Sequence, residues 1–174
     1  AFPSFCPVCQ ARLVRPKGEA IWRCPNQKRC PAQQRKLLYH FVSKKAFDMK
    51  GLGPKILNAL VQEHLVSIAP DIFELEAGDL ASMKRFGEKS AANIVQAINN
   101  SKRVELSRFI FALGIRHAGE ETSQDLADYF GSIQKLANAQ KEDLERMPGV
   151  GGVVGESIFQ WFQSKENSKL ISEL

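Results

Sequence analysis

One pattern recurs four times along this 174-residue chain and restricts the folds open to it. Glycine stands at positions 53, 87, 119 and 151, at spacings of 34, 32 and 32 residues. Apolar residues keep fixed offsets around each glycine: four positions before lie Met49, Met83, Ile115 and Met147, and seven after lie Leu60, Ile94, Leu126 and Ile158. Self-similarity at such a period indicates one supersecondary unit used several times.

The repeated unit is predicted to be a helix–hairpin–helix, because the apolar offsets on either side of the glycine each mark one face of a helix. Glycine is expected at the end of the turn since it accepts a positive φ and lets another backbone approach closely. The outgoing helix begins at the glycine, so its first N–H groups point outward and form an anion site. Similar turns occur in helical bundles that bind nothing, but four in register favour a surface that holds phosphates.

The four repeats differ beside their glycines. The first and fourth have a full Gly-x-Gly, whereas Arg85 and His117 replace the first glycine in the second and third. Lys55 and Lys89 lie two residues after their glycines, where a lysine can lie beside the phosphate that the amides hold. The residues predicted to form this surface are Gly51, Gly53, Lys55, Arg85, Gly87, Lys89, Arg116, His117, Gly119, Gly149 and Gly151.

All four cysteines lie within the first 30 residues, spaced as Cys-x2-Cys and then Cys-x5-Cys. Residues 11–15 and 20–23 between the pairs are predicted to form a β-hairpin that turns at Pro16-Lys17-Gly18. Two cysteine pairs flanking a hairpin can bring four thiolates into a tetrahedron, the geometry of a structural zinc site. Two disulfides or a redox motif are the alternatives. The predicted Zn²⁺ ligands are Cys6, Cys9, Cys24 and Cys30.

The predicted fold class is mainly α, a small four-cysteine zinc finger with a β-hairpin followed by a four-fold helix–hairpin–helix domain. We expect a zinc finger at 1–30, a linking helix within 31–45 that Pro31 begins, and a tandem domain at 46–174. Its hairpins are predicted near 51–53, 85–87, 117–119 and 149–151. Predicted helices cover 32–42, 54–64, 77–83, 87–101, 105–113, 119–130, 132–139, 141–147, 151–163 and 167–173. Gly155 falls inside a predicted helix, where glycine costs about 1 kcal/mol relative to alanine.

The net charge of +5 is unevenly distributed. Residues 1–45 hold ten Lys and Arg against one acidic residue, whereas the remainder holds 14 basic and 18 acidic residues. A basic N-terminal part suits nucleic acid or another polyanion. No apolar run approaches the length of a membrane span, and the start at Ala1 leads us to expect a fragment or a processed product.

No catalytic residue is predicted. Gly87-Glu88-Lys89-Ser90 resembles the end of a P-loop, but it lacks the upstream glycine and the preceding strand. Gly149-x-Gly151-x3-Gly155 resembles a dinucleotide fingerprint, but the segment before it is predicted to be helical. No nucleophile–base pair and no pair of carboxylates stands out in the sequence.

Several of these segments, in this order, resemble bacterial NAD-dependent DNA ligase. They are Phe2-Pro3-x-x-Cys6-Pro7-x-Cys9, Cys24-x5-Cys30, His40-Phe41-Val42-Ser43, the hairpin at 51–53, and Ala112-Leu113-Gly114-Ile115-Arg116. The resemblance covers nearly the whole chain and implies the zinc finger and helix–hairpin–helix region of that enzyme. In the family an adenylation domain and an OB domain precede this region and a BRCT domain usually follows, and the Lys-x-Asp-Gly motif of nucleotidyl transfer is missing here.

The resemblance implies a non-catalytic fragment that grips duplex DNA across the minor groove at nicks, in replication and repair. It implies structural zinc in the fragment, and NAD bound by the parent enzyme and not by this part. The expected partners are nicked duplex DNA and the absent adenylation and OB domains of the same chain; we expect a monomer, no membrane, and a bacterial cytoplasmic location at the nucleoid. The alternatives are a stand-alone DNA-repair scaffold with tandem hairpins and a zinc-containing helical bundle that binds proteins.

Overall fold

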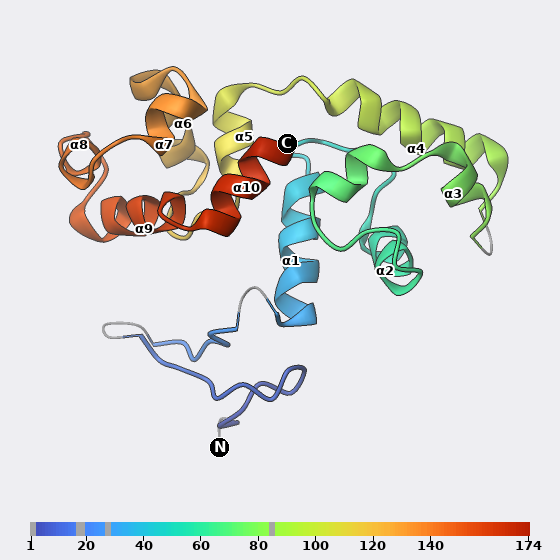
Figure 1. The fold of residues 1–174 in the computed structure, drawn as a ribbon, viewed down its shortest axis with the longest axis horizontal. Coiled ribbons are helices and arrows are strands. Elements are labelled where there is room, and N and C mark those ends of the chain that lie inside the picture. The colour runs from blue at the N-terminus through green and yellow to red at the C-terminus, as the bar shows by residue number, and fades with distance from the viewer. Residues whose placement is uncertain (1–2, 17–19, 27–28, 84–85) are drawn as a thin grey trace.

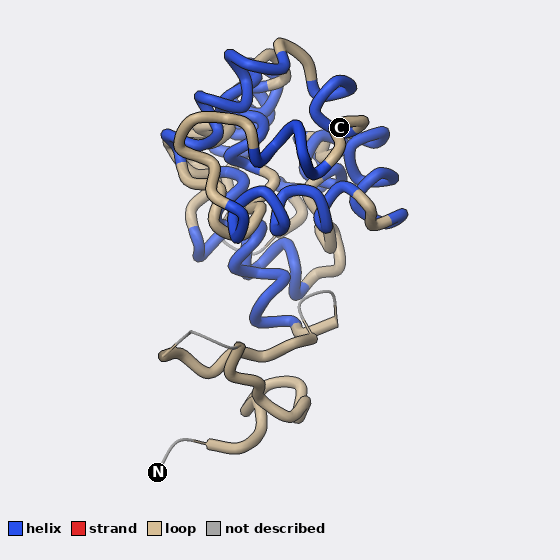
Figure 2. Tube along the Cα trace, turned by 90° about the vertical axis from the view of Figure 1, so that its left-hand side faces the viewer, coloured by secondary structure: helices blue, strands red, loops and turns tan. Residues whose placement is uncertain are grey.

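The computed structural model describes residues 3–16, 20–26, 29–83 and 86–174. One helix, α1, stands between a small cysteine-containing module and two groups of helices that lie to either side of its upper end (Figure 1). A view turned by 90° shows the same separation, with the module at the bottom and the helical part above it (Figure 2). The predicted fold class is confirmed: the chain is mainly helical, with a four-cysteine cluster before the helical part.

Each predicted helix is present, and its ends lie within two residues of the predicted ones. The structure adds η1, a 3₁₀ helix outside the predicted helices. The Asp71 carboxylate accepts hydrogen bonds from the backbone N–H groups of Ser67 and Ile68 and so stabilises this tight turn. The elements are α1 (Pro31–Val42), α2 (Pro54–Gln62), η1 (Pro70–Glu74), α3 (Ala77–Ala81), α4 (Glu88–Ser101), α5 (Leu106–Ala112), α6 (Glu120–Phe130), α7 (Ile133–Ala137), α8 (Lys141–Glu145), α9 (Gly152–Phe162) and α10 (Lys165–Glu173).

The N-terminal module, which we call the finger (residues 3–30), pairs its backbone through two isolated antiparallel bridges. Val14 and Arg23 exchange both backbone hydrogen bonds, at 2.9 and 2.8 Å, which is the pairing expected of the predicted β-hairpin. The second bridge, Phe5 with Arg12, pairs the hairpin with the segment before the first cysteine pair. The predicted turn at 16–18 falls partly outside the described residues.

The helical part has two apolar cores. The first runs from Leu38 to Ala112 and includes the buried faces of α1, α2 and α4. The second runs from Ile110 to Phe162 and includes those of α6, α8 and α9. Phe109 of α5 and Leu174 pack against both cores, so α5 and the end of the chain join them. Each core contains two of the four hairpins, and the domain boundaries stay a prediction.

The loop after α1 is held by polar contacts from α5 and α6. Arg108 donates from Nε to the carbonyl of Ala46 at 2.8 Å and from Nη2 to that of Lys44 at 2.7 Å. Lys45 forms an ion pair with Glu120 at the start of α6. These contacts link the segment leading into the first hairpin to the second core.

Gly155 is buried inside α9, against α8. A Cβ atom added there would lie 3.3 Å from Cγ of Glu145 and 3.6 Å from Cβ of Leu144, both on α8. Glycine at this position therefore lets the two helices approach closely, which offsets its low helix propensity.

Candidate zinc centre and nucleic-acid interface

The outgoing helix of each hairpin begins directly after the repeated glycine. Gly53, Gly87, Gly119 and Gly151 are the N-cap residues of α2, α4, α6 and α9, and none supplies a side-chain cap. All four are exposed, and no heavy atom lies within 4 Å of a Cβ atom added at any of them. Because the first N–H groups of a helix have no partner within the helix, these turns present backbone donors that another molecule can approach closely. At α2 the first helical residue is Pro54, which has no N–H, so the nearest donors there are those of Gly53 and Lys55.

The reason expected for the repeated glycine was wrong in one respect. At Gly53, Gly87, Gly119 and Gly151 the φ angles are −73°, −93°, −79° and −77°, ordinary for any residue. The positive φ lies two positions earlier, at Gly51 (92°), His117 (66°) and Gly149 (80°). The chain reverses direction at that earlier residue. The repeated glycine, two positions later, has the extended backbone of a helix N-cap. The equivalent residue of the second hairpin, Arg85, lies outside the described residues.

Replacing His117 by glycine is expected to raise the free energy of unfolding by about 0.5–1 kcal/mol, because a residue with a Cβ atom is strained at φ 66°. The melting temperature should rise by about 1–3 °C. Thermal denaturation followed by circular dichroism measures the change. His117→Ala keeps the Cβ atom and is the control: if it melts at or above the temperature of His117→Gly, the strain is not at this residue.

The charges beside the four turns differ. Lys55 and Lys89, each two residues after its glycine, are both exposed, and exposed Glu88 stands beside Lys89 in the first turn of α4. The third hairpin has Glu120 and Glu121 in the first turn of α6, and Glu120 is paired with Lys45. The fourth has no charge in the first turn of α9 and carries Val153, whose side chain is 72% exposed. The four N-cap glycines share an extended backbone, but the charges beside them differ.

Of the remaining predicted residues, Arg116 is half-buried, and the Nε and Nη2 atoms of its guanidinium are buried. Its carbonyl accepts a hydrogen bond from Ser157 Oγ at 2.8 Å, which joins the third hairpin to α9. Lys45 was not among the predicted site residues. Its pairing with a residue 75 positions away has no local sequence signal.

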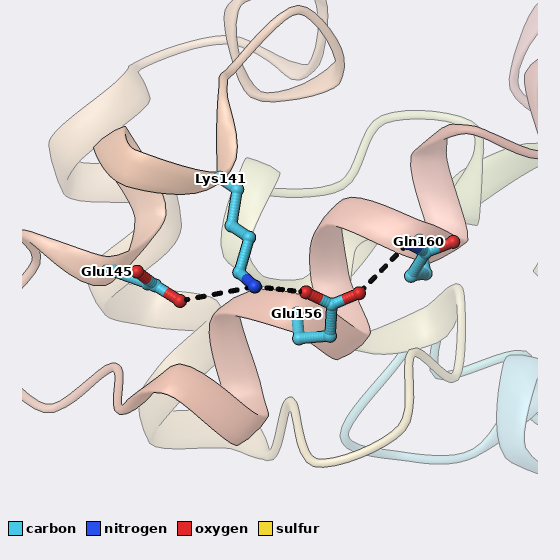
Figure 3. A network of polar contacts seen from close by, with 4 residues as sticks. All are labelled: Lys141, Glu145, Glu156 and Gln160. Carbon is cyan, nitrogen blue, oxygen red and sulfur yellow. Dashed lines mark hydrogen bonds and ion pairs between the residues drawn. The ribbon is translucent and has the colours of Figure 1, made fainter.

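An ion-pair network joins α8 to α9, the helices before and after the fourth hairpin (Figure 3). Lys141 Nζ of α8 lies 2.6 Å from Glu156 Oε2 of α9 and 3.7 Å from Glu145, and Glu156 also accepts from Gln160 Nε2 at 2.9 Å. The hydrogen bond between the pair raises the pKa of Lys141 and lowers that of Glu156. Both side chains are partly exposed, so solvent screens the ion pairs and they add little to stability; their main effect is to fix α8 against α9.

The four cysteine sulfurs form one cluster in the finger, in which all four Sγ atoms lie within 4.8 Å of one another. Cys6 Sγ is 3.9 Å from that of Cys30, and Cys9 Sγ is 3.4 Å from that of Cys24. A tetrahedron with Zn–S bonds of about 2.3 Å has sulfur–sulfur edges of about 3.8 Å. The four thiols are free, and their spacing fits four ligands around one ion.

The surroundings of Cys6 and Cys24 shift the pKa values of their thiols in opposite directions. Hydrogen bonds from the backbone N–H groups of Cys9 and Val8 lower the pKa of Cys6 to about 7. Burial raises the pKa of Cys24 to about 12. Backbone N–H groups directed at Cys6 stabilise its thiolate, the form that binds metal.

The fold and this cluster define a four-cysteine finger joined to tandem helix–hairpin–helix units, and comparisons with known proteins agree. Residues 5–32 match the C4 zinc finger domain of NAD-dependent DNA ligase, residues 44–100 match a SAM-like helix-hairpin-helix tandem, and residues 108–171 match a helix-hairpin-helix motif. The chain is 43% identical over 174 residues to a DNA ligase of Psychrobacter sp. (strain PRwf-1). The resemblance to the zinc-finger and helix–hairpin–helix region of NAD-dependent DNA ligase is thereby confirmed.

The match covers 99% of this chain but only 25% of that ligase, so the chain spans about a quarter of the length of its relative. Among the described residues, no helix is long and apolar enough to cross a membrane.

Proposed function

We propose that this chain is the part of an NAD-dependent DNA ligase that holds duplex DNA at a nick, without sequence preference and without catalytic residues of its own. The observation that carries the proposal is the set of four exposed N-cap glycines, each opening a helix whose first N–H groups another molecule can approach. The matches to helix-hairpin-helix models support it.

Backbone N–H groups at helix N-termini bind phosphate oxygens and do not read base edges, so the binding is independent of sequence. Lys55 and Lys89 add positive charge in the first turns of α2 and α4. A lysine there opposes the helix dipole, and a bound anion compensates for that repulsion. Glu88 in the first turn of α4 offsets part of the charge of Lys89, so the first hairpin is assigned the strongest phosphate contact and the second the next strongest.

The other two hairpins contribute differently. The third carries Glu120 and Glu121, which repel phosphate, so its contact rests on the backbone of Gly119 and on His117. The fourth offers Gly149 and Gly151 with no charge in the first turn of α9. Arg85, outside the described residues, stays a candidate contact of the second hairpin, and half-buried Arg116 is a candidate only if its side chain rearranges on binding.

Zinc has a structural role in this proposal. Cys6, Cys9, Cys24 and Cys30 hold one Zn²⁺ ion, supported by the sulfur–sulfur distances and by the match of residues 5–32. A site of four cysteine ligands is closed to substrate, so the ion supplies folding energy and no catalysis.

Ligation chemistry is assigned to the rest of the longer protein. The nucleotidyl-lysine motif Lys-x-Asp-Gly does not occur in this sequence. The adenylation and OB domains of the same chain are the proposed partners. They would bind NAD, and the whole monomer would act on nicked DNA in a bacterial cytoplasm.

Fluorescence anisotropy with labelled duplexes tests the proposal. The chain should bind a nicked duplex and a scrambled duplex of equal length with affinities within roughly threefold, since phosphate contacts carry no sequence information. Incubation with radiolabelled NAD should leave the chain unlabelled. Absence of duplex binding favours the protein-binding bundle, and binding to junctions alone favours the repair scaffold. Covalent label on the chain would contradict the non-catalytic assignment.

A further inference from the structure

Residues 43–47, which we call the joint loop, lie where the two cores meet. Ala46 and Phe47, at the end of this loop, are buried in the first core. Arg108 of α5, a helix that packs against both cores, and Glu120 of α6, a helix of the second core, contact the same loop. Because the first hairpin follows directly, whatever holds the joint loop also places that hairpin relative to α5 and α6.

Arg108 makes the stronger of the two contacts. Its Nε donates to the carbonyl of Ala46 at 2.8 Å and its Nη2 to that of Lys44 at 2.7 Å, and its side chain is half-buried. Hydrogen bonds from a charged donor are stronger than neutral ones, and the planar fork of a guanidinium can orient two acceptors at once. A lysine at this position would keep the charge but lose the fork.

An ion pair ties the same loop to the third hairpin. Lys45 pairs with Glu120, the first residue of α6, which directly follows the N-cap Gly119. The two side chains are 64% and 52% exposed, so solvent screens this pair and it holds the loop less firmly than Arg108 does. The joint loop therefore connects the first hairpin, in one core, to the third hairpin, in the other.

The arrangement of the two cores matters because each carries two hairpins and a DNA duplex is stiff. The persistence length of DNA is about 150 bp, so a short duplex cannot bend freely to follow two cores that move independently. Hairpins on both cores can hold the phosphates of one duplex only in a matching arrangement. Any freedom between the cores must be lost on binding, and that loss lowers the affinity.

We infer that Arg108, assisted by the pair of Lys45 with Glu120, is a positioning residue that holds the hairpins of the two cores in the arrangement that one duplex requires. This inference rests on the proposed function. Arg108 acts through the joint loop and not on DNA, since its Nε and Nη2 already donate to backbone carbonyls. A loosened joint can still reach the bound arrangement, so the same phosphates are neutralised, but a smaller fraction of the molecules is ready to bind.

Changing Arg108 to lysine and, separately, to glutamine in the 174-residue chain tests the inference. Both variants lose the paired carbonyl contacts, and both should bind a labelled nicked duplex about three- to tenfold more weakly at about 50 mM salt. The log–log salt slope should stay that of wild type, because no phosphate contact is removed. Lys135→Gln, at an exposed lysine of α7, is the control for the charge lost in Arg108→Gln.

A direct phosphate contact by Arg108 predicts a different pattern. Arg108→Gln would then lower the salt slope by about 0.9 relative to wild type, whereas Arg108→Lys would keep most of the affinity and the slope, because lysine also binds phosphate. That pattern overturns the positioning role.

Glu120→Gln and Glu121→Gln form a matched pair that tests the second contact. Each removes one exposed carboxylate from the first turn of α6, and Glu120 is in addition the partner of Lys45. Losing a charge that repels phosphate should by itself strengthen duplex binding about twofold, which is expected of Glu121→Gln. Glu120→Gln should bind no more tightly than wild type, because it also loosens the joint. If the two variants gain affinity equally, the ion pair has no positioning role.

Hydrogen exchange reports on the joint without DNA. The backbone amides of residues 43–50 should exchange faster in Arg108→Lys than in wild type, with binding measured below the melting transition of each variant. Unchanged exchange, or faster exchange with the affinity of wild type, overturns the inference. Either result leaves the hairpin proposal standing as long as wild type binds DNA; no binding by wild type overturns both.

Discussion

Replacing Cys24 by serine is expected to unfold residues 5–30 while the helical part stays folded. The finger has few large buried side chains of its own, because its core consists of Cys6, Cys24 and Cys30. A module of this kind depends on the metal, and structural zinc supplies about 10–16 kcal/mol in small zinc-finger peptides. The two helical cores contain none of the cysteines and should keep their melting transition.

Three measurements check this prediction. Elemental analysis should find one zinc ion per chain in wild type and much less in the variant. Limited proteolysis should cleave the variant before α1, and the helical circular dichroism should change little. Ala20→Ser, which adds a hydroxyl to the exposed surface of the finger and keeps all four thiols, is the control. Metal-free wild type with two disulfides by mass would contradict the zinc site.

Replacing Gly53 and Gly151 by valine is expected to weaken duplex binding by roughly 10- to 100-fold, the loss of one to two hydrogen bonds to charged groups. A valine side chain fits the extended φ of both residues, and no protein atom lies within 4 Å of its Cβ. The variant should therefore fold, and its added methyl groups should keep the phosphate from the backbone amides.

Gly78→Val is the matched control, since Gly78 also has open space around it but lies in α3 and is not the N-cap of an outgoing helix. It should bind DNA as wild type does. If the Gly53 and Gly151 variant folds and binds like Gly78→Val, close approach to these two turns is not needed for binding.

The hairpin repeat could be predicted because its determinants are local. Apolar spacing of about 3.6 residues marks each helix, and the glycine marks where each outgoing helix begins. The cysteine cluster could also be predicted from the sequence, because two closely spaced pairs limit the ways in which four thiols can meet. The 43% identity to a ligase agrees with both.

The sequence did not reveal which residue of each turn takes the positive φ. His117 adopts a positive φ although a residue with a Cβ atom disfavours it, so the residue type alone is misleading at that position. Nor could local patterns predict the ion pair of Lys45 with Glu120 or the close packing of Gly155 against α8, since both depend on segments brought together by folding. These features decide how the hairpins differ from one another.

The central claim, that hairpins with lysines beside their N-caps hold phosphates, is tested most directly by a salt titration of duplex binding. Wild type and Lys55→Ala with Lys89→Ala are compared on a nicked duplex and a scrambled one, with Lys135→Ala and Lys169→Ala as the control of equal charge. The double variant should bind every sequence more weakly, and its log–log salt slope should be smaller by about two. Equal affinity and equal slope for wild type and variant, or a preference of several orders of magnitude for one sequence, would contradict the account.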